Sequence, residues 1–475
     1  MPLLRVGCGL ADITPPLGTP LSGFIARENK PSERIEDRIF VRALAIRTEG
    51  EISFLLNYEV LGLKADLVDR IRQVMENDLQ IALPEQCCVI TATHTHSSVP
   101  LTPLEGEVDV DPAYIPFLLR QTVNAARQAL DRCAPANLHV ASQHIAGLTY
   151  NRRALLEDGR VSMALEPDAP VLVRGPVDDL LTLLVWKNPD TGSPLAGMVH
   201  FACHGVALCT QAISGDIPGQ IMQHFEHILQ APCLFLQGAS GDVNPIAAAG
   251  ERPAMLNWCA AFASQVGGLT ERLQPAQQEP FVLAALVQPL EYQQLPQRAQ
   301  VEQAIQGYKR IALGQMDPSD AVSLQLLADL MNTPPGQLPD PTRAAFSAAA
   351  LANAGRRVLQ VIDSGQPPEP CPLHMTGWRL GDLLLVFSAA ELFTVTGLSI
   401  RGLNPQLTIL PVTHAAPIVG YVPDAGSIRQ GGYEVKDAWQ FYRQPAPFSE
   451  GAEASITAAV GTLVATIKGE AHILP

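Results

Sequence analysis

The stretch Cys87-Cys88-Val89-Ile90-Thr91-Ala92-Thr93-His94-Thr95-His96-Ser97-Ser98 decides how the rest of the chain is interpreted. A short apolar run ends in two histidines two residues apart, and such residues share a face in an extended segment. In open α/β sheets, ligands bind at the carboxyl ends of strands. His94 and His96 therefore suggest a divalent metal, with zinc favoured because it accepts neutral imidazole nitrogen. The alternative is a histidine pair that only hydrogen-bonds loop backbone.

Strand-like and helix-like segments alternate along most of the chain and predict an α/β fold. Residues 41–47 and 52–58 form a predicted hairpin. Further strands are expected at 87–93, 137–145, 181–186, 196–202, 233–237, 383–388 and 407–412, and helices at 64–77, 113–132, 218–229 and 455–468. We expect a mixed β-sheet catalytic domain with flanking helices. It would be a single domain, 1–475, with a helical insertion at about 293–366 and loops at 1–35 and 420–447.

The charge balance and hydrophobicity of the chain argue against some classes of partner and against a membrane-spanning segment. The 475 residues carry 32 Lys and Arg against 47 Asp and Glu, a net charge of −15. This balance argues against nucleic acid or an anionic membrane as a partner. We expect a small-molecule substrate, which the charge balance itself does not identify. No apolar run approaches the ~18 residues of a membrane span, so no integral membrane segment is expected.

The cysteines and the N-terminus predict the compartment. The nine cysteines include several inside apolar strand-like runs and form no Cys-x-x-Cys pair, which favours buried free thiols in a reducing environment. The first residues lack the charged and apolar regions of a signal peptide. The sequence thus predicts a cytoplasmic protein, the alternative being an exported one whose signal was removed.

Polar residues follow an apolar strand at several other places. His200 and His204 are four residues apart at one such end, and Asp242 lies in a Gly-rich turn after 233–237. Glu391 follows 383–388, and Tyr421 follows Gly420. Each has an ordinary structural explanation alone, such as a helix N-terminus for the glutamate or loop packing for the tyrosine. Their repetition suggests one shared site.

The set of motifs resembles the neutral/alkaline non-lysosomal ceramidases and their wider superfamily of zinc hydrolases. The resemblance runs in order from about residue 5 to 468. Its motifs are Gly9-Leu10-Ala11-Asp12-Ile13-Thr14-Pro15, Ala92-Thr93-His94-Thr95-His96-Ser97, Asn151-Arg152, Phe201-Ala202-Cys203-His204, Gly241-Asp242-Val243-Asn244-Pro245, Ala390-Glu391-Leu392-Phe393, and Tyr421-Val422 with Tyr433-Glu434.

The resemblance implies roles for individual residues. Zinc would be bound by four side chains and a water molecule, the side chains being His94, His204, Glu391 and Tyr421. His96 would act as acid and base, and Arg152 and Tyr433 would contact substrate or stabilise an oxyanion. Asp242 would line the pocket or orient a zinc-binding histidine. His414 is interpreted as a packing residue.

Two departures from the family pattern limit which properties of the family can be expected of this chain. Asn244 stands where ceramidases have serine, so we expect it only to line the pocket. The chain ends soon after the tyrosine loop, where ceramidases add an immunoglobulin-like domain. The leading hypothesis is a zinc-dependent hydrolase that cleaves an amide (N-acyl) bond with a metal-activated water. The alternatives are an ester, lactone or glycosidic bond at the same site, or a non-catalytic zinc-stabilised binding protein.

Overall fold

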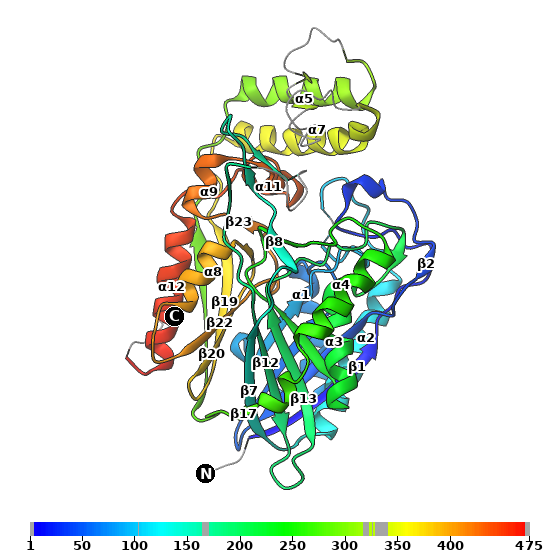
Figure 1. The fold of residues 1–475 in the computed structure, drawn as a ribbon. Coiled ribbons are helices and arrows are strands. Elements are labelled where there is room, and N and C mark those ends of the chain that lie inside the picture. Colours follow the sequence, from blue (N-terminus) through cyan, green and yellow to red (C-terminus); the bar gives the residue numbers. More distant parts are fainter. Residues whose placement is uncertain are drawn as a thin grey trace.

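Three β-sheets form the body of the protein, and each contains the same four-strand unit. The computed structural model describes residues 4–102, 104–163, 171–316, 323–324, 326–327 and 341–470 (Figure 1). In each unit, three antiparallel strands are followed by a crossover helix and a strand that returns parallel to the third. The predicted α/β class is confirmed.

The first sheet has the order β5-β4-β3-β1-β6. Its predicted hairpin is present as β3 and β4, and helix α1 (Ala65–Leu79) leads into β5, parallel to β4. The strands are β1 (Arg5–Asp12), β3 (Phe40–Arg47), β4 (Ile52–Tyr58), β5 (Cys88–Ala92) and β6 (Ala134–Pro135). Strand β1 lies in the first 35 residues, where only loops were expected, because its glycines pack against helix α2 (Tyr114–Asp131) rather than forming turns.

The second and third sheets repeat this order. The second is β15-β13-β12-β7-β17, with crossover helix α3 (Asp216–Leu229), and the third is β22-β20-β19-β18, with α8 (Thr394–Arg401). Their strands are β7 (Asn137–His144), β12 (Leu180–Lys187), β13 (Pro194–Phe201), β15 (Cys233–Gln237), β17 (Gln274–Pro275), β18 (Phe281–Leu290), β19 (Cys371–Leu380), β20 (Leu383–Ser388) and β22 (Thr408–Val412).

The carboxyl ends of the three parallel strand pairs meet at one place. An isolated bridge joins Thr95 of the first unit to Gly205 of the second, and another joins Thr91 to Ala415 of the third. The Thr413 amide donates to the Gln237 carbonyl at 2.8 Å, which closes the third side. Residues that leave these strands are therefore brought together although they are up to 324 positions apart in the chain, as Thr91 and Ala415 are.

Apolar residues fill the space between the sheets and behind them. One buried cluster draws on all three sheets, for example through Leu44, Leu184 and Leu385. Helices α1 and α2 cover the other face of the first sheet, and α3 and α4 (Arg252–Gln265) cover that of the second. Helix α12 (Ala452–Ile467) packs on β18 and β19. None of the described helices is long and apolar enough to cross a membrane.

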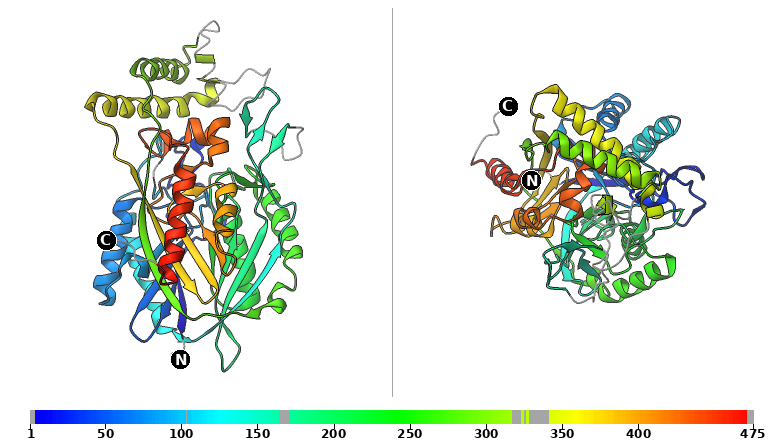
Figure 2. Two further views of the ribbon diagram at one scale, coloured as in Figure 1. Left: turned by 90° about the vertical axis from the view of Figure 1, so that its left-hand side faces the viewer. Right: turned by 90° about the horizontal axis from the view of Figure 1, so that it is seen from above.

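The expected insertion lies across the end of the molecule where the three units meet. Helices α5 (Arg298–Ala312) and α7 (Pro341–Ser364) pack against each other above the sheets (Figures 1 and 2). Most of 317–340 falls outside the described residues. Arg357 of α7 pairs with the buried Glu105, which fastens the insertion to the body.

The region 420–447 is more ordered than the loop that was expected. It contains short helices because its aromatic side chains pack against the body and against α7, and its Gly content hides the helical period. The helices are α9 (Ala425–Gln430), α10 (Tyr433–Lys436) and α11 (Ala438–Phe441).

The remaining strands are short and pair outside the three sheets. They are β2 (Arg34–Ile35) with β14 (Ala212–Ile213), β8 (Thr149–Asn151) with β16 (Val243–Pro245), β21 (Glu391–Leu392) with β23 (Tyr421–Val422), and the group β9 (Ala154–Leu155), β10 (Val161–Ser162) and β11 (Val173–Arg174). The parallel pair β21 and β23 sets Glu391 opposite Tyr421.

Candidate metal centre

Four histidines and a glutamate converge where the three units meet. His94 and His96 follow β5, His204 follows β13, Glu391 follows β20 and His414 follows β22. All five side chains are buried. The structure therefore brings together three of the four predicted ligands, adds the predicted acid/base His96, and adds His414.

The ligand-type atoms lie close enough to share one cation. Nε2 of His94 is 3.0 Å from Nε2 of His204 and 3.3 Å from Nε2 of His96. Oε2 of Glu391 is 3.2 Å from Nε2 of His94 and 3.6 Å from Nε2 of His204. Such spacing is expected of atoms that surround a metal, because ligands of zinc lie about 2.0–2.2 Å from it.

Hydrogen bonds at the far side of each ring fix which nitrogen carries the proton. Nδ1 of His94 lies 2.8 Å from the Leu61 carbonyl, and Nδ1 of His204 lies 2.9 Å from the Ser240 carbonyl. A carbonyl only accepts, so both Nδ1 atoms donate and both Nε2 atoms of the neutral rings carry lone pairs. Two lone pairs facing each other at 3.0 Å repel unless a cation lies between them. This pattern, in which the outer nitrogen donates to backbone, is typical of metal-binding histidines.

The charge states suit a cation. Burial, together with His94 nearby, lowers the pKa of His204 well below its usual 6.5. Neutral imidazole and ionised carboxylate are the forms that bind zinc.

The two carboxylate oxygens of Glu391 differ in their hydrogen bonding. The Tyr442 hydroxyl donates to Oε1, whereas Oε2 accepts no hydrogen bond from the residues that the structure describes. A buried carboxylate oxygen without a partner costs free energy unless a cation satisfies it. Tyr442 was not anticipated from the sequence, where it is one tyrosine in a Gly- and aromatic-containing segment.

His414 is a second residue that the sequence interpretation missed. It was assigned to packing, but its Nε2 is 3.6 Å from Oε2 of Glu391 and its ring centroid is 4.1 Å from that of His94. A signal was present: Thr93-His94 and Thr413-His414 are the same dipeptide at the ends of two apolar strands.

Tyr421 and Arg152 form the next layer. Tyr421 is the registered partner of Glu391 in a parallel pair, so both side chains project to the same face. Its ring lies parallel to that of His204, with centroids 6.5 Å apart. Nη2 of Arg152 donates to the Tyr421 hydroxyl at 3.1 Å, and Nη1 donates to Oδ1 of Asn244 at 3.3 Å. Glu434 holds Nε of Arg152 at 2.9 Å.

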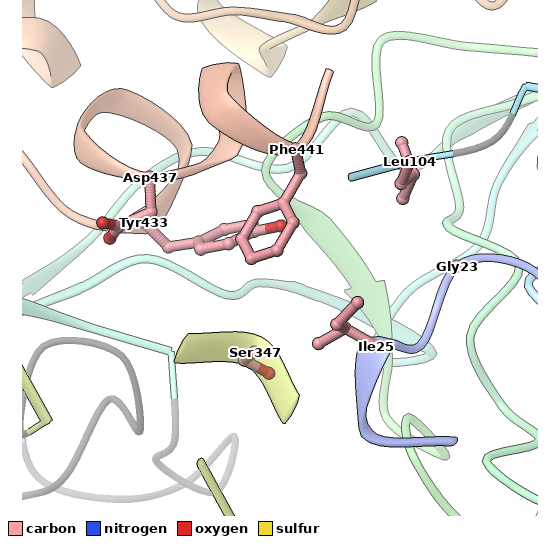
Figure 3. Close-up of a pocket in the computed structure, with 7 residues that line it drawn as sticks. All are labelled: Gly23, Ile25, Leu104, Ser347, Tyr433, Asp437 and Phe441. Atoms are coloured by element: carbon pink, nitrogen blue, oxygen red, sulfur yellow. The ribbon is translucent and has the colours of Figure 1, made fainter. Parts of the chain in front are cut away.

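A cavity of about 90 Å³ lies between helix α7, which contributes Ser347, and the segment that carries Tyr433 and Phe441 (Figure 3). It is lined by Gly23, Ile25, Leu104, Ser347, Tyr433, Asp437 and Phe441. His96 is 9% exposed whereas His94, His204 and Glu391 are at 0%, and a methyl group on Gly23 would lie 2.5 Å from Nδ1 of His96. His96 thus lies next to Gly23, which lines the cavity, and Tyr433 forms part of the cavity wall.

Asp242 holds together segments next to the site through hydrogen bonds. Its carboxylate accepts from the Thr394 amide and hydroxyl at 2.8 Å each, and from Nδ2 of Asn151 at 2.6 Å. Its backbone carbonyl accepts from the Arg152 amide. The expected contact with a zinc-binding histidine is instead made by the Ser240 carbonyl, because the turn points Asp242 toward α8. Burial raises the pKa of Asp242 to about 6.

Comparisons with known proteins agree with this geometry. The sequence pattern of the neutral/alkaline non-lysosomal ceramidases, N-terminal region, matches residues 4–268. No curated protein sequence matches the chain. Two solved structures share the fold: neutral ceramidase from Pseudomonas aeruginosa (16% identity, TM-score 0.67) and a ceramidase complexed with C2 (16% identity, TM-score 0.68). In both, the match covers 100% of this chain and 77% of the other. The chain belongs to the neutral/alkaline non-lysosomal ceramidase family.

Proposed function

We propose that this protein is a zinc-dependent hydrolase that cleaves the amide bond of a small N-acyl substrate. The observation that carries the proposal is the group of buried lone pairs on His94, His204 and Glu391, which face one another with no hydrogen between them. These three side chains would hold the metal, with Tyr421 at the same face. When bound, zinc polarises a carbonyl and lowers the pKa of a water molecule toward 7, which supplies a nucleophile at neutral pH.

His96 is placed to move the proton. Its Nε2 is 3.3 Å from Nε2 of His94, and its ring lies next to Gly23, which lines the cavity. Burial lowers its pKa well below 6.5, so the ring is neutral at pH 7 and can accept a proton from the attacking water. The same nitrogen then donates the proton to the nitrogen of the leaving amine, because an unprotonated amine anion is a poor leaving group.

Arg152 and Tyr421 are placed to stabilise the negative oxygen of the tetrahedral intermediate. Arg152 is buried, so its charge acts through a medium of low dielectric. Its guanidinium is held by Glu434 and already donates to the Tyr421 hydroxyl. Tyr433 would contact the substrate from the cavity wall. Asn244, at the position where ceramidases have serine, accepts from Arg152 and helps to orient it.

Family membership and the cavity favour a particular substrate. Both structural relatives are ceramidases, and ceramide contains an amide. The cavity of about 90 Å³ is smaller than the ~300–1,000 Å³ of pockets that take drug-sized ligands. Ile25, Leu104 and Phe441 make an apolar wall, and α7 contributes Ser347 to the lining (Figure 3). We therefore propose a short acyl group as the buried part of the substrate.

A substrate panel tests the proposal. N-acyl amines with acyl chains of two, four, eight and sixteen carbons would be compared with matched esters and glycosides. We expect hydrolysis of the amides, with kcat/KM falling as the chain lengthens, loss of activity with chelator and recovery with zinc. Activity on esters or glycosides alone would contradict the amidase proposal, and a preference for sixteen carbons would contradict the short-acyl proposal.

Gly23→Ala tests the role of His96 without removing it. The new methyl group would meet the ring of His96 at 2.5 Å and push it from its position. Because a shift of about 1 Å can cost 10²-fold, we expect kcat to fall roughly 100-fold while zinc content stays the same.

Gly18→Ala is the matched control for this change. Gly18 has a φ of +91°, against +96° at Gly23, but no atom lies within 4 Å of its added methyl group. Both variants carry the same backbone strain, so only Gly23→Ala should lose activity. Equal activity in the two proteins would show that the position of His96 is not critical.

A further inference from the structure

We infer that His414 is a third imidazole ligand of the metal, in addition to His94 and His204. The inference rests on the proposed zinc site and concerns its composition. It would give the site a more nitrogen-rich ligand set than the sequence motifs imply.

The hydrogen bonds around Thr413 fix the proton on the His414 ring. The Thr413 hydroxyl is 2.6 Å from the Gly238 carbonyl and 2.7 Å from Nδ1 of His414. A hydroxyl has one proton, and the carbonyl can only accept it. Thr413 therefore donates to Gly238 and accepts from Nδ1–H, which leaves a lone pair on Nε2 of the neutral ring.

That lone pair has no hydrogen-bond donor among the described residues. It is buried and lies 3.6 Å from Oε2 of Glu391, which is likewise without a donor. Two buried acceptors that face each other are unfavourable alone, and a shared cation satisfies both. Nδ1 of His414 is bonded to a neighbouring oxygen, as in His94 and His204, which fits the usual arrangement around metal-binding histidines.

The available ligand atoms form one centre and not two. One group consists of His94, His96 and His204, and the other of His94, Glu391 and His414. Both groups need Nε2 of His94, which has a single lone pair and binds a single cation. His414 therefore belongs to the same metal as His94.

The backbone presents His414 in the way that it presents His94. Each follows its returning strand by two residues, after a threonine, with φ of 58° and 64° respectively. The His94 amide donates to the Val60 carbonyl and the His414 amide to the Ala390 carbonyl, in each case two residues beyond the third strand of the unit. Non-glycine residues with positive φ are uncommon, and they cluster at functional sites.

X-ray absorption at the zinc edge counts the imidazoles directly. We expect His414→Ala and His414→Gln to show one imidazole fewer than the wild type, with zinc bound at least 10-fold more weakly in chelator competition. A loss of zinc affinity alone does not show that His414 is a ligand. Removing a residue that only hydrogen-bonds to a ligand also lowers metal affinity 10–100-fold. His414→Gln is included in case the alanine protein does not fold.

His200→Gln is the matched control. His200 is also a fully buried histidine of a site-forming strand, but its Nε2 is occupied by the Pro411 carbonyl at 2.9 Å. Its imidazole count should equal that of the wild type. An unchanged count in a zinc-loaded His414 variant would overturn the inference and leave the proposed function intact. A wild-type protein that binds no zinc would overturn both.

Discussion

Replacing Glu391 by glutamine is expected to remove zinc and hydrolytic activity together. Among the described side chains that converge on the site, Glu391 is the only carboxylate, and its Oε2 lies within 3.6 Å of Nε2 of His94, His204 and His414. Glutamine keeps the shape but loses the charge, and its NH₂ group cannot bind a cation. We expect zinc affinity to fall by more than ~100-fold. This is more than the loss expected when a residue that only hydrogen-bonds to a ligand is removed.

Zinc content after dialysis and turnover of an N-acyl amine measure this effect. Glu226→Gln serves as the control, since Glu226 of α3 pairs with Arg42 of β3 rather than with a side chain of the metal site, and the variant should keep full zinc and activity. A Glu391→Gln protein with full zinc would mean that the glutamate is not a ligand. Full zinc with lost activity would instead assign it a role in proton transfer.

Replacing Arg152 by methionine should leave zinc in place and lower kcat by roughly 10²–10³, the range seen when one oxyanion donor is removed. Its guanidinium reaches both Tyr421 and Asn244 at the edge of the site. Binding of the ground-state substrate depends less on this charge, so KM should change little.

The neighbouring residue provides the comparison. Arg153 pairs with the same Glu434 but donates its other hydrogen bonds to the Ser427 and Gly431 carbonyls. Arg153→Met should therefore lower the melting temperature, because it leaves a buried charge with one partner fewer, while the folded enzyme keeps its kcat. If the two variants lost kcat equally, Arg152 would be a structural residue rather than one that acts on the reaction.

The strands and main helices could be predicted because the spacing of apolar residues that defines each of them lies within one short segment of the sequence. The segment 52–58 is an example: five of its seven residues are hydrophobic, and β4 has the same bounds. The loop at 420–447 was predicted less well, since α9, α10 and α11 are short and depend on tertiary contacts of Tyr433 and Phe441 rather than on their own periodicity.

The repeated four-strand unit could not be read from the sequence. Its crossover helices differ in length, from Ala65–Leu79 to Thr394–Arg401, and the whole insertion that holds α5 and α7 separates β18 from β19. A fixed period is therefore absent. The unit becomes visible only through strand pairing, which depends on contacts between distant segments.

Most of the candidate site was predicted through the family motifs, and the residues that were missed lie outside them. Tyr442 carries no recognisable spacing, and the Thr-His dipeptide that His414 shares with His94 does not show that His414 reaches Glu391, because both contacts exist only in the folded chain. Asp242 was placed near the site correctly, but its hydrogen-bond partners depend on the direction of a single turn. Sequence spacing sets which face of a strand a residue occupies and leaves open which other strand that face meets.

The central claim is that ligands scattered over the chain form one zinc site. Elemental analysis of the purified protein, prepared without chelator, tests it most directly when the wild type is compared with His204→Ala. We expect about one zinc per wild-type chain and almost none in the variant, since His204 supplies one of the two lone pairs that meet at 3.0 Å. Wild-type protein without zinc, or a variant that retains it in full, would contradict the account.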